Sequence, residues 1–109
     1  MEGLELTAFQ IISSVGTARS CYIEAIQAAK KSDYEEAEKL IKEGDEAFIE
    51  GHDAHAGLLQ KEASGEGNTV NLLILHAEDQ LMSAEAFKTI ALEFIDAYKR
   101  IAELEAKLA

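Results

Sequence analysis

The sequence predicts an all-α fold, an antiparallel bundle of three long helices in a single domain spanning residues 1–109. Three observations carry this prediction. The chain contains no proline, so nothing in it obliges a helix to break. Alanine, leucine, glutamate and lysine, all strong helix formers, dominate the composition. Hydrophobic residues make up 48% and charged residues 28%, a balance that favours a packed core over a disordered chain.

The first helix is predicted to run from Leu4 or Thr7 to Ala29. Lys30 and Lys31 follow its last turn, where the helix dipole favours cations. Apolar residues recur in this segment at steps of three and four, which places them on one side of a helix. They are Ala8, Ile11, Ile12, Val15, Ala18, Tyr22, Ala25, Ile26 and Ala29.

The second helix is predicted to begin at Ser32, because serine followed three residues later by Glu35 is a capping box. Gly44 and Gly51 lie one heptad apart in it, and each costs roughly 1 kcal/mol relative to alanine. They are either tolerated weak points or places where a neighbouring helix approaches closely, and both readings stay open. The apolar stripe is Ala37, Leu40, Ile41, Gly44, Phe48, His52, His55 and Leu59.

The third helix is predicted from about Val70 to Lys107, after a glycine-containing loop at 63–68 and with Asn68 or Thr69 as its cap. We expect its apolar stripe to face the other helices. The stripe is Leu73, His76, Gln80, Ser83, Phe87, Ile90, Phe94, Tyr98 and Ile101.

The length of these helices predicts an elongated molecule. A helix of about 35 residues is roughly 50 Å long, whereas a compact domain of about 100 residues has a radius of gyration near 13 Å. Long rods of this kind expose much surface for each core residue. We therefore expect the chain to bury a second face by forming a homo-oligomer.

The charge balance of the chain disfavours several classes of binding partner. The formal net charge is −11, from 21 acidic and 10 basic side chains, which disfavours nucleic acid and anionic membranes as partners. No apolar run approaches the ~20 residues that span a bilayer, so direct membrane insertion is not expected. The acidic start of the chain does not resemble a secretory signal, and the single Cys21, read as core packing, fits a reducing cytoplasm.

A polar group interrupts the apolar start of the third helix. His76, Asp79 and Gln80 lie three and four residues apart, so they share a side of the helix. An aspartate on such a side is costly unless something pairs with it. The histidine is either a reactive group or a hydrogen-bonded core residue, and His52 and His55 face the same choice.

Four segments together resemble the lactose/cellobiose-type enzyme IIA component of the bacterial sugar phosphotransferase system. The segment 75–82, Leu-His-Ala-Glu-Asp-Gln-Leu-Met, is similar to that family's pattern His-(Ala/Gly)-Gln-Asp-His-Leu-Met. Residues 16–20 resemble its Gly-x-Ala-Arg-Ser, residues 34–44 its acidic opening of helix two, and residues 62–66 its inter-helix loop. The similarity covers nearly the whole chain in the right order.

The resemblance implies a phosphotransferase component with a phosphohistidine intermediate. It implies that His76 accepts a phosphoryl group from the phosphocarrier HPr and passes it to a cysteine of the IIB component, while the membrane IIC component transports the sugar. It also implies a homotrimer in which Asp79 from each subunit surrounds a divalent cation, Mg²⁺, on the trimer axis. Gln80 is a candidate supporting residue beside His76.

The sequence departs from the family pattern at supporting positions. Gln80 replaces the second histidine of the motif, and Glu78 replaces its glutamine. On helix two the family pattern His-x-x-Gln-Thr is replaced by His52, His55 and the alanine that follows.

Two other functions compete with the phosphoryl carrier. One is a non-catalytic acidic helical adaptor. The other is a small metal-binding bundle that uses His52, His55, His76 and nearby carboxylates, although none of these histidines lies in the Glu-x-x-His pattern of ferritin-like sites.

Overall fold

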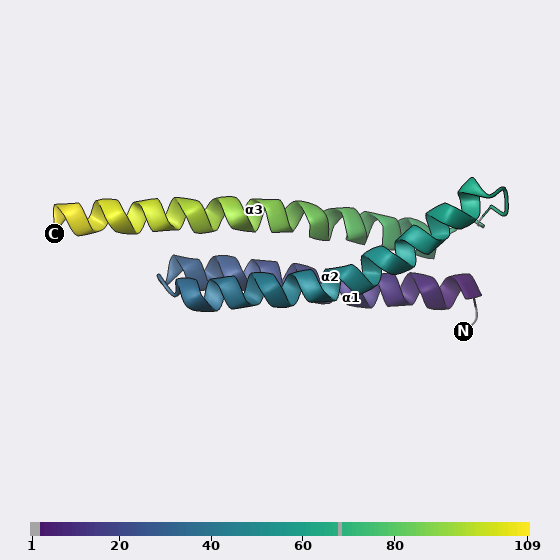
Figure 1. The fold of residues 1–109 in the computed structure, drawn as a ribbon, viewed down its shortest axis with the longest axis horizontal. Coiled ribbons are helices and arrows are strands. Elements are labelled where there is room, and N and C mark those ends of the chain that lie inside the picture. The colour runs from purple at the N-terminus through teal and green to yellow at the C-terminus, as the bar shows by residue number, and fades with distance from the viewer. Residues whose placement is uncertain (1–2, 68) are drawn as a thin grey trace.

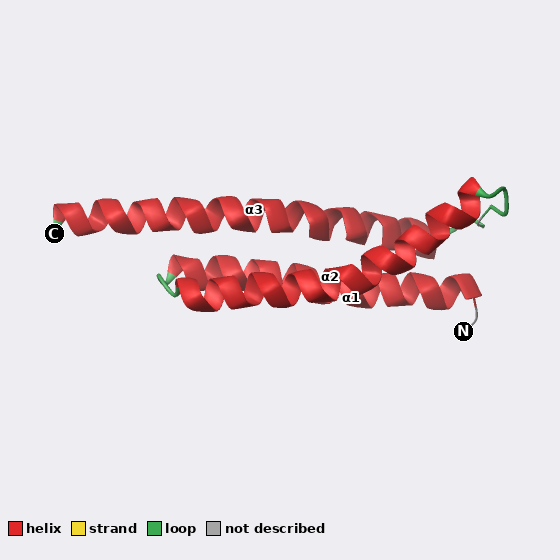
Figure 2. Cartoon of the chain, in the orientation of Figure 1, coloured by secondary structure: helices red, strands yellow, loops and turns green. Residues whose placement is uncertain are grey.

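The structure, a computed structural model, describes residues 3–67 and 69–109 as three α-helices (Figures 1 and 2). Helix α1 spans Gly3–Lys30, α2 spans Tyr34–Ala63 and α3 spans Leu72–Leu108. Helices α1 and α2 form an antiparallel hairpin, and α3 runs antiparallel to α2 (Figure 1). The described residues contain no strand (Figure 2). The predicted all-α, three-helix fold is confirmed.

The molecule is a rod that measures 63 × 22 × 20 Å. Its radius of gyration is 17.5 Å, compared with about 13 Å for a compact domain of about 100 residues. The C-terminal turns of α3 extend past the turn that joins α1 and α2 (Figure 1). The predicted elongation is therefore confirmed. None of the described helices combines the length and apolar character needed to cross a membrane.

The cap of α2 differs from the prediction by one residue. Ser32 has a φ of 63° and donates its backbone N–H to the Ala29 carbonyl at 2.9 Å, so it closes α1. The N-cap is Asp33, whose carboxylate accepts from the Glu36 N–H at 3.2 Å. The capping box of Ser32 and Glu35 is wrong because a residue in the left-handed region that ends one helix does not also begin the next.

The cap of α3 lies later than predicted. Asn71 has an extended backbone, and its side-chain oxygen accepts from the Ile74 N–H at 3.0 Å. Thr69 precedes this cap by two residues, and Asn68 lies outside the described residues. Asparagine at the N-cap satisfies one of the backbone donors that the first turn leaves unpaired.

The core runs along α1, which packs against both α2 and α3, whereas α2 and α3 meet only sparsely. Alanine supplies eight of the thirteen buried core residues, so the helices approach closely. The core consists of Ala8, Ile11, Val15, Ala18, Tyr22, Ala25, Ala29, Ala37, Ala77, Leu81, Ala84, Ala91 and Ile95.

The two buried glycines of α2 mark close helix approaches, which settles the alternative that the sequence left open. A Cβ atom on Gly44 would lie 2.6 Å from Tyr22 Cε1, and one on Gly51 would lie 2.6 Å from Val15 Cγ1. Both distances are shorter than any ordinary van der Waals contact. The glycines therefore let α2 lie directly against α1.

The predicted inward stripe of α3 is wrong by a rotation of the helix. The buried residues of α3 are Ala77, Leu81, Ala84, Ala91 and Ile95, which we call the inner flank. Several residues of the predicted stripe lie instead on an exposed neighbouring side together with Asp79. This outer flank comprises His76, Asp79, Ile90, Phe94 and Ile101, all exposed.

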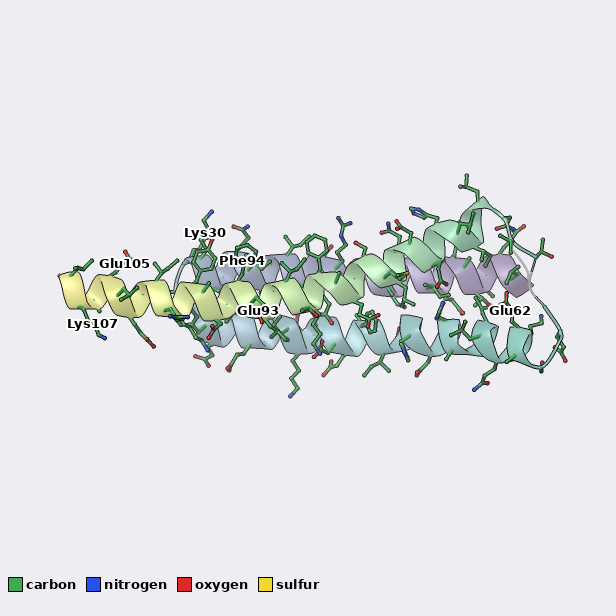
Figure 3. All side chains as sticks on the ribbon, turned by 90° about the horizontal axis from the view of Figure 1, so that it is seen from above. Lys30, Glu62, Glu93, Phe94, Glu105 and Lys107 are labelled. Carbon is green, nitrogen blue, oxygen red and sulfur yellow. The ribbon has the colours of Figure 1, made fainter. Side chains whose placement is uncertain are left out.

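Small side chains explain the rotation. Because α1 lies close to α3, alanine fills the space between them, and the bulkier apolar residues remain outside. Ile90, Phe94 and Ile101 are 42%, 46% and 47% exposed. Figure 3 shows Phe94 on the flank of α3 that faces away from α2. A single chain thus leaves an apolar strip along α3 without cover.

Candidate functional site

His76 and Asp79 lie in the first two turns of α3, and both are exposed. They are three residues apart, so the imidazole and the carboxylate project from the same side of the helix. The Asn71 cap and the buried Ala77 hold this part of α3 in place. The histidine is therefore not a sealed core residue: its ring is open to a second protein.

Gln80 lies one turn after His76 and is half-buried. It stands between the outer flank and the inner flank, next to the buried Leu81. The structure thus brings His76, Asp79 and Gln80 to one end of α3, as the spacing predicted, although it leaves the first two of them outside the core.

The three histidines do not gather at one site. His52 is 60% exposed, with Nδ1 3.9 Å from the Asp53 carboxylate on the same helix. His55 contacts Glu78 of α3 instead, through Nε2 and Oε2. Across the described residues of the chain, no group of three or more His, Cys, Asp or Glu side chains is arranged to hold a metal ion. A metal-binding bundle built from His52, His55 and His76 of one chain is therefore not formed.

The contact between His55 and Glu78 escaped sequence analysis. The two side chains belong to different helices and are 12% and 47% exposed. The relative rotation of α2 and α3 decides whether they meet, and no periodicity within either helix reports it. The only available signal was that both residues depart from the family pattern.

Grooves separate α2 from α3 on either side of this contact. One has a volume of 250 Å³ and lies toward the inter-helix loop, with Leu59, Val70, Leu75 and the His55–Glu78 pair on its walls. The other has a volume of 610 Å³ and lies further along the rod, with Ile49, His52 and Leu92 among its lining residues. The sparse packing between α2 and α3 thus leaves open space at both places.

A polar network joins all three helices beside the larger groove. The Tyr22 hydroxyl of α1 donates to Asp45 Oδ1 of α2 at 2.6 Å, and Lys88 Nζ of α3 lies 3.1 Å from the same oxygen. Burial, followed by the hydrogen bond to Asp45 and the charge of that carboxylate, raises the pKa of the Tyr22 hydroxyl well above its usual value. This network serves to stabilise the fold, because it keeps a buried phenol paired.

Cys21 is half-buried next to this network. Burial, and then the charges of Glu43 and Glu24, raise the pKa of its thiol. A raised pKa disfavours the thiolate, which is the reactive form of cysteine. The environment of Cys21 thus agrees with its interpretation as a packing residue.

Comparison with known proteins places these residues in context. The family model for the lactose/cellobiose-specific IIA subunit of the phosphotransferase system matches residues 6–99. The lichenan-specific phosphotransferase enzyme IIA component of Bacillus subtilis (strain 168) is 42% identical over 102 residues, which cover 94% of this chain and 93% of that protein. The lactose-specific EIIA component of Staphylococcus aureus is 35% identical over 99 residues, covering 91% and 96%.

A solved structure has the same fold. The crystal structure of the cellobiose-specific enzyme IIA from Bacillus anthracis superposes with a TM-score of 0.90 at 38% sequence identity. The match covers 94% of this chain and 95% of that one. Sequence and structure comparisons therefore agree over almost the full rod.

Proposed function

The chain belongs to the lactose/cellobiose-specific IIA family of the phosphotransferase system, and from this premise we propose that His76 is the residue that carries the phosphoryl group. Membership makes the chain a phosphoryl-carrier component of a sugar phosphotransferase system, which implies exchange with HPr and the IIB component. The observation that supports His76 is its exposed imidazole at the start of α3. A carrier must present its acceptor to two proteins in turn, and this ring is open to both.

The chemistry suits an imidazole. A ring nitrogen that carries no proton attacks the phosphorus of phospho-HPr, so a P–N bond forms at His76 as the bond to HPr breaks. A cysteine thiolate of IIB then attacks the same phosphorus, and the P–N bond of His76 breaks. Histidine forms covalent intermediates of this kind, and positioning with charge stabilisation governs the rate. We propose that Gln80, one turn after His76, supports the ring by donating a hydrogen bond.

We propose that three chains associate through the part of the outer flank from Asp79 to Ile101, which leaves His76 beyond the end of the contact. This strip carries exposed Ile90, Phe94 and Ile101 along α3, and Asp79 at one end. Apolar residues repeated along one side of a helix favour packing against another helix. Three copies of the strip around one axis would cover the apolar residues and bring three carboxylates together.

Gathering three Asp79 carboxylates calls for a cation. One chain lacks a metal cluster among its described residues, whereas one exposed carboxylate from each of three chains supplies oxygen ligands that suit Mg²⁺. The residue therefore fits the proposed ion at a shared axis. When bound, the ion would offset the repulsion among the three carboxylates and the repulsion between them and the phosphoryl group. Asp79 would hold the ion one helical turn from His76.

Substitution of His76 tests the acceptor. We expect His76→Ala and His76→Gln to fold normally, because the side chain is exposed, and to accept no label from phosphoenolpyruvate, enzyme I and HPr. Mapping the labelled residue in the unsubstituted protein gives the positive counterpart, an acid-labile phosphate on His76. Label retained by His76→Gln would contradict the assignment, and absence of label from the unsubstituted chain would favour the acidic adaptor.

Substitution of Asp79 tests the axial cation. Asp79→Leu removes the carboxylates that repel one another, so we expect the assembly to persist or strengthen and to lose its response to chelators. Sedimentation with and without EDTA measures both effects. Dissociation of Asp79→Leu into monomers would count against a cation held by this residue.

A further inference from the structure

His55 and Glu78 form a polar tie between α2 and α3 near the proposed acceptor. The His55 Nε2–H donates to Glu78 Oε2, and His55 is mostly buried in this contact. Glu78 lies two residues after His76 on the same helix. The tie thus connects the last third of α2 to the part of α3 that carries the imidazole.

The His55–Glu78 tie lies near the start of α3, the part of the helix that it would hold in place. Figure 3 shows α2 and α3 diverging toward the loop that joins them. Both residues line the 250 Å³ groove that opens there. The pair therefore lies beside this groove, at the end of α3 that carries His76.

Another polar contact between the same helices lies far from the acceptor. Lys88 Nζ of α3 is 3.1 Å from Asp45 Oδ1 of α2. Lys88 lies about 18 Å further along α3 than His76, at roughly 1.5 Å per residue. The Asp45–Lys88 pair also ties α2 to α3, and its distance from His76 makes it a matched control.

A pair of glutamines in place of His55 and Glu78 would keep the same kind of contact. An imidazole and a carboxylate make one donor–acceptor contact, and so do two amides. The two side chains meet in the structure. A change at either position alone would leave the other side chain without this partner.

We propose that His55 is a positioning residue for phosphoryl transfer: its bond to Glu78 fixes the first turns of α3 and thereby the direction of the His76 imidazole. This inference rests on the proposed role of His76. In-line transfer depends strongly on geometry, and small displacements of a reacting group lower the rate substantially. His55 acts through Glu78 and does not touch the phosphoryl group.

The experiment compares five variants in single-turnover transfer from phospho-HPr. His55→Ala and Glu78→Ala each lower the saturating rate about tenfold while the dependence on HPr concentration changes little. The double alanine variant is no slower than either single variant, because both remove the same bond. The double variant H55Q/E78Q restores the rate through an amide pair. Lys88→Ala lowers stability and leaves the rate unchanged.

Hydrogen exchange provides a readout that does not depend on the acceptor. Amides of residues 75–80 exchange faster in His55→Ala than in the unsubstituted chain and are unaffected in Lys88→Ala. An unchanged transfer rate in folded His55→Ala, or failure of H55Q/E78Q to restore it, overturns the positioning role. Label mapped to a residue other than His76 overturns the proposed function instead, while unchanged exchange in His55→Ala would show that the tie does not hold α3.

Discussion

The two flanks of α3 differ in the size of the side chains they carry. The inner flank consists of three alanines with Leu81 and Ile95, all buried against the rest of the chain. The outer flank carries Ile90, Phe94 and Ile101, each more than two-fifths exposed, together with His76 and Asp79. Small residues make the contact with α1, and the large apolar residues stay exposed in one chain. In a single chain, the buried side of α3 is therefore not the side that carries its large exposed apolar residues.

Charged substitutions on the outer flank should disrupt the proposed interface between chains. In the double variant I90E/I101E, carboxylates replace two apolar side chains at the proposed interface, so we expect the assembly to fall to the mass of one 11.9 kDa chain with its helix content retained. Sedimentation and circular dichroism measure the two quantities. Leu92→Glu is the matched control, because Leu92 is 46% exposed on the side of α3 that faces α2. A double variant that keeps the mass of the unsubstituted assembly would place the interface elsewhere.

A larger side chain on the inner flank should disrupt the packing of the core. Ala84 is fully buried, so Ala84→Leu forces extra carbon atoms into a packed core and lowers the free energy of unfolding by about 1–3 kcal/mol. Urea denaturation measures the loss. Ala106→Leu provides the comparison, because Ala106 is exposed near the C-terminal end of α3 and tolerates the larger side chain. Equal stability of the two variants would mean that the inner flank is loosely packed.

The smallest effect concerns the glycines that let α2 approach α1. Alanine is the better helix former by about 1 kcal/mol, so Gly57→Ala, where the added Cβ meets nothing within 4 Å, raises stability by that amount. Gly51→Ala places its Cβ against the stiff side chain of Val15, and overpacking of about 1–3 kcal/mol offsets or exceeds the gain. Thermal unfolding of the pair gives the sign. Stabilisation by Gly51→Ala equal to that by Gly57→Ala would show that α1 and α2 separate easily.

Sequence analysis predicted the helices better than their contacts. The 3.6-residue period and the absence of proline were enough to predict three helices, because helix formation is local. The caps shifted to Asp33 and Asn71 because several capping residues occur near each boundary. The predicted stripe of α3 rests on the spacing of residues along the helix and is wrong, because it leaves out the alanines that the close approach of α1 selects.

For the candidate site, too, the sequence predicted the local arrangement and not the contacts between helices. The spacing of His76, Asp79 and Gln80 was enough to place them at one end of α3, since residues three and four apart share a side of a helix. The exposure of His76 and the contact of His55 with Glu78 depend on how helices rotate against one another. That rotation is a property of the whole packing, so no single segment of sequence contains it.

The C-terminal end of α3 continues past the hairpin with little to lean on, and from residue 103 onward every side chain is exposed. Residues 103–109 therefore contribute little to the packing of one chain. We expect removal of these residues to leave the fold of one chain intact and to weaken the proposed association of chains. The packing of one chain and the proposed association of chains thus depend on different parts of the same helix.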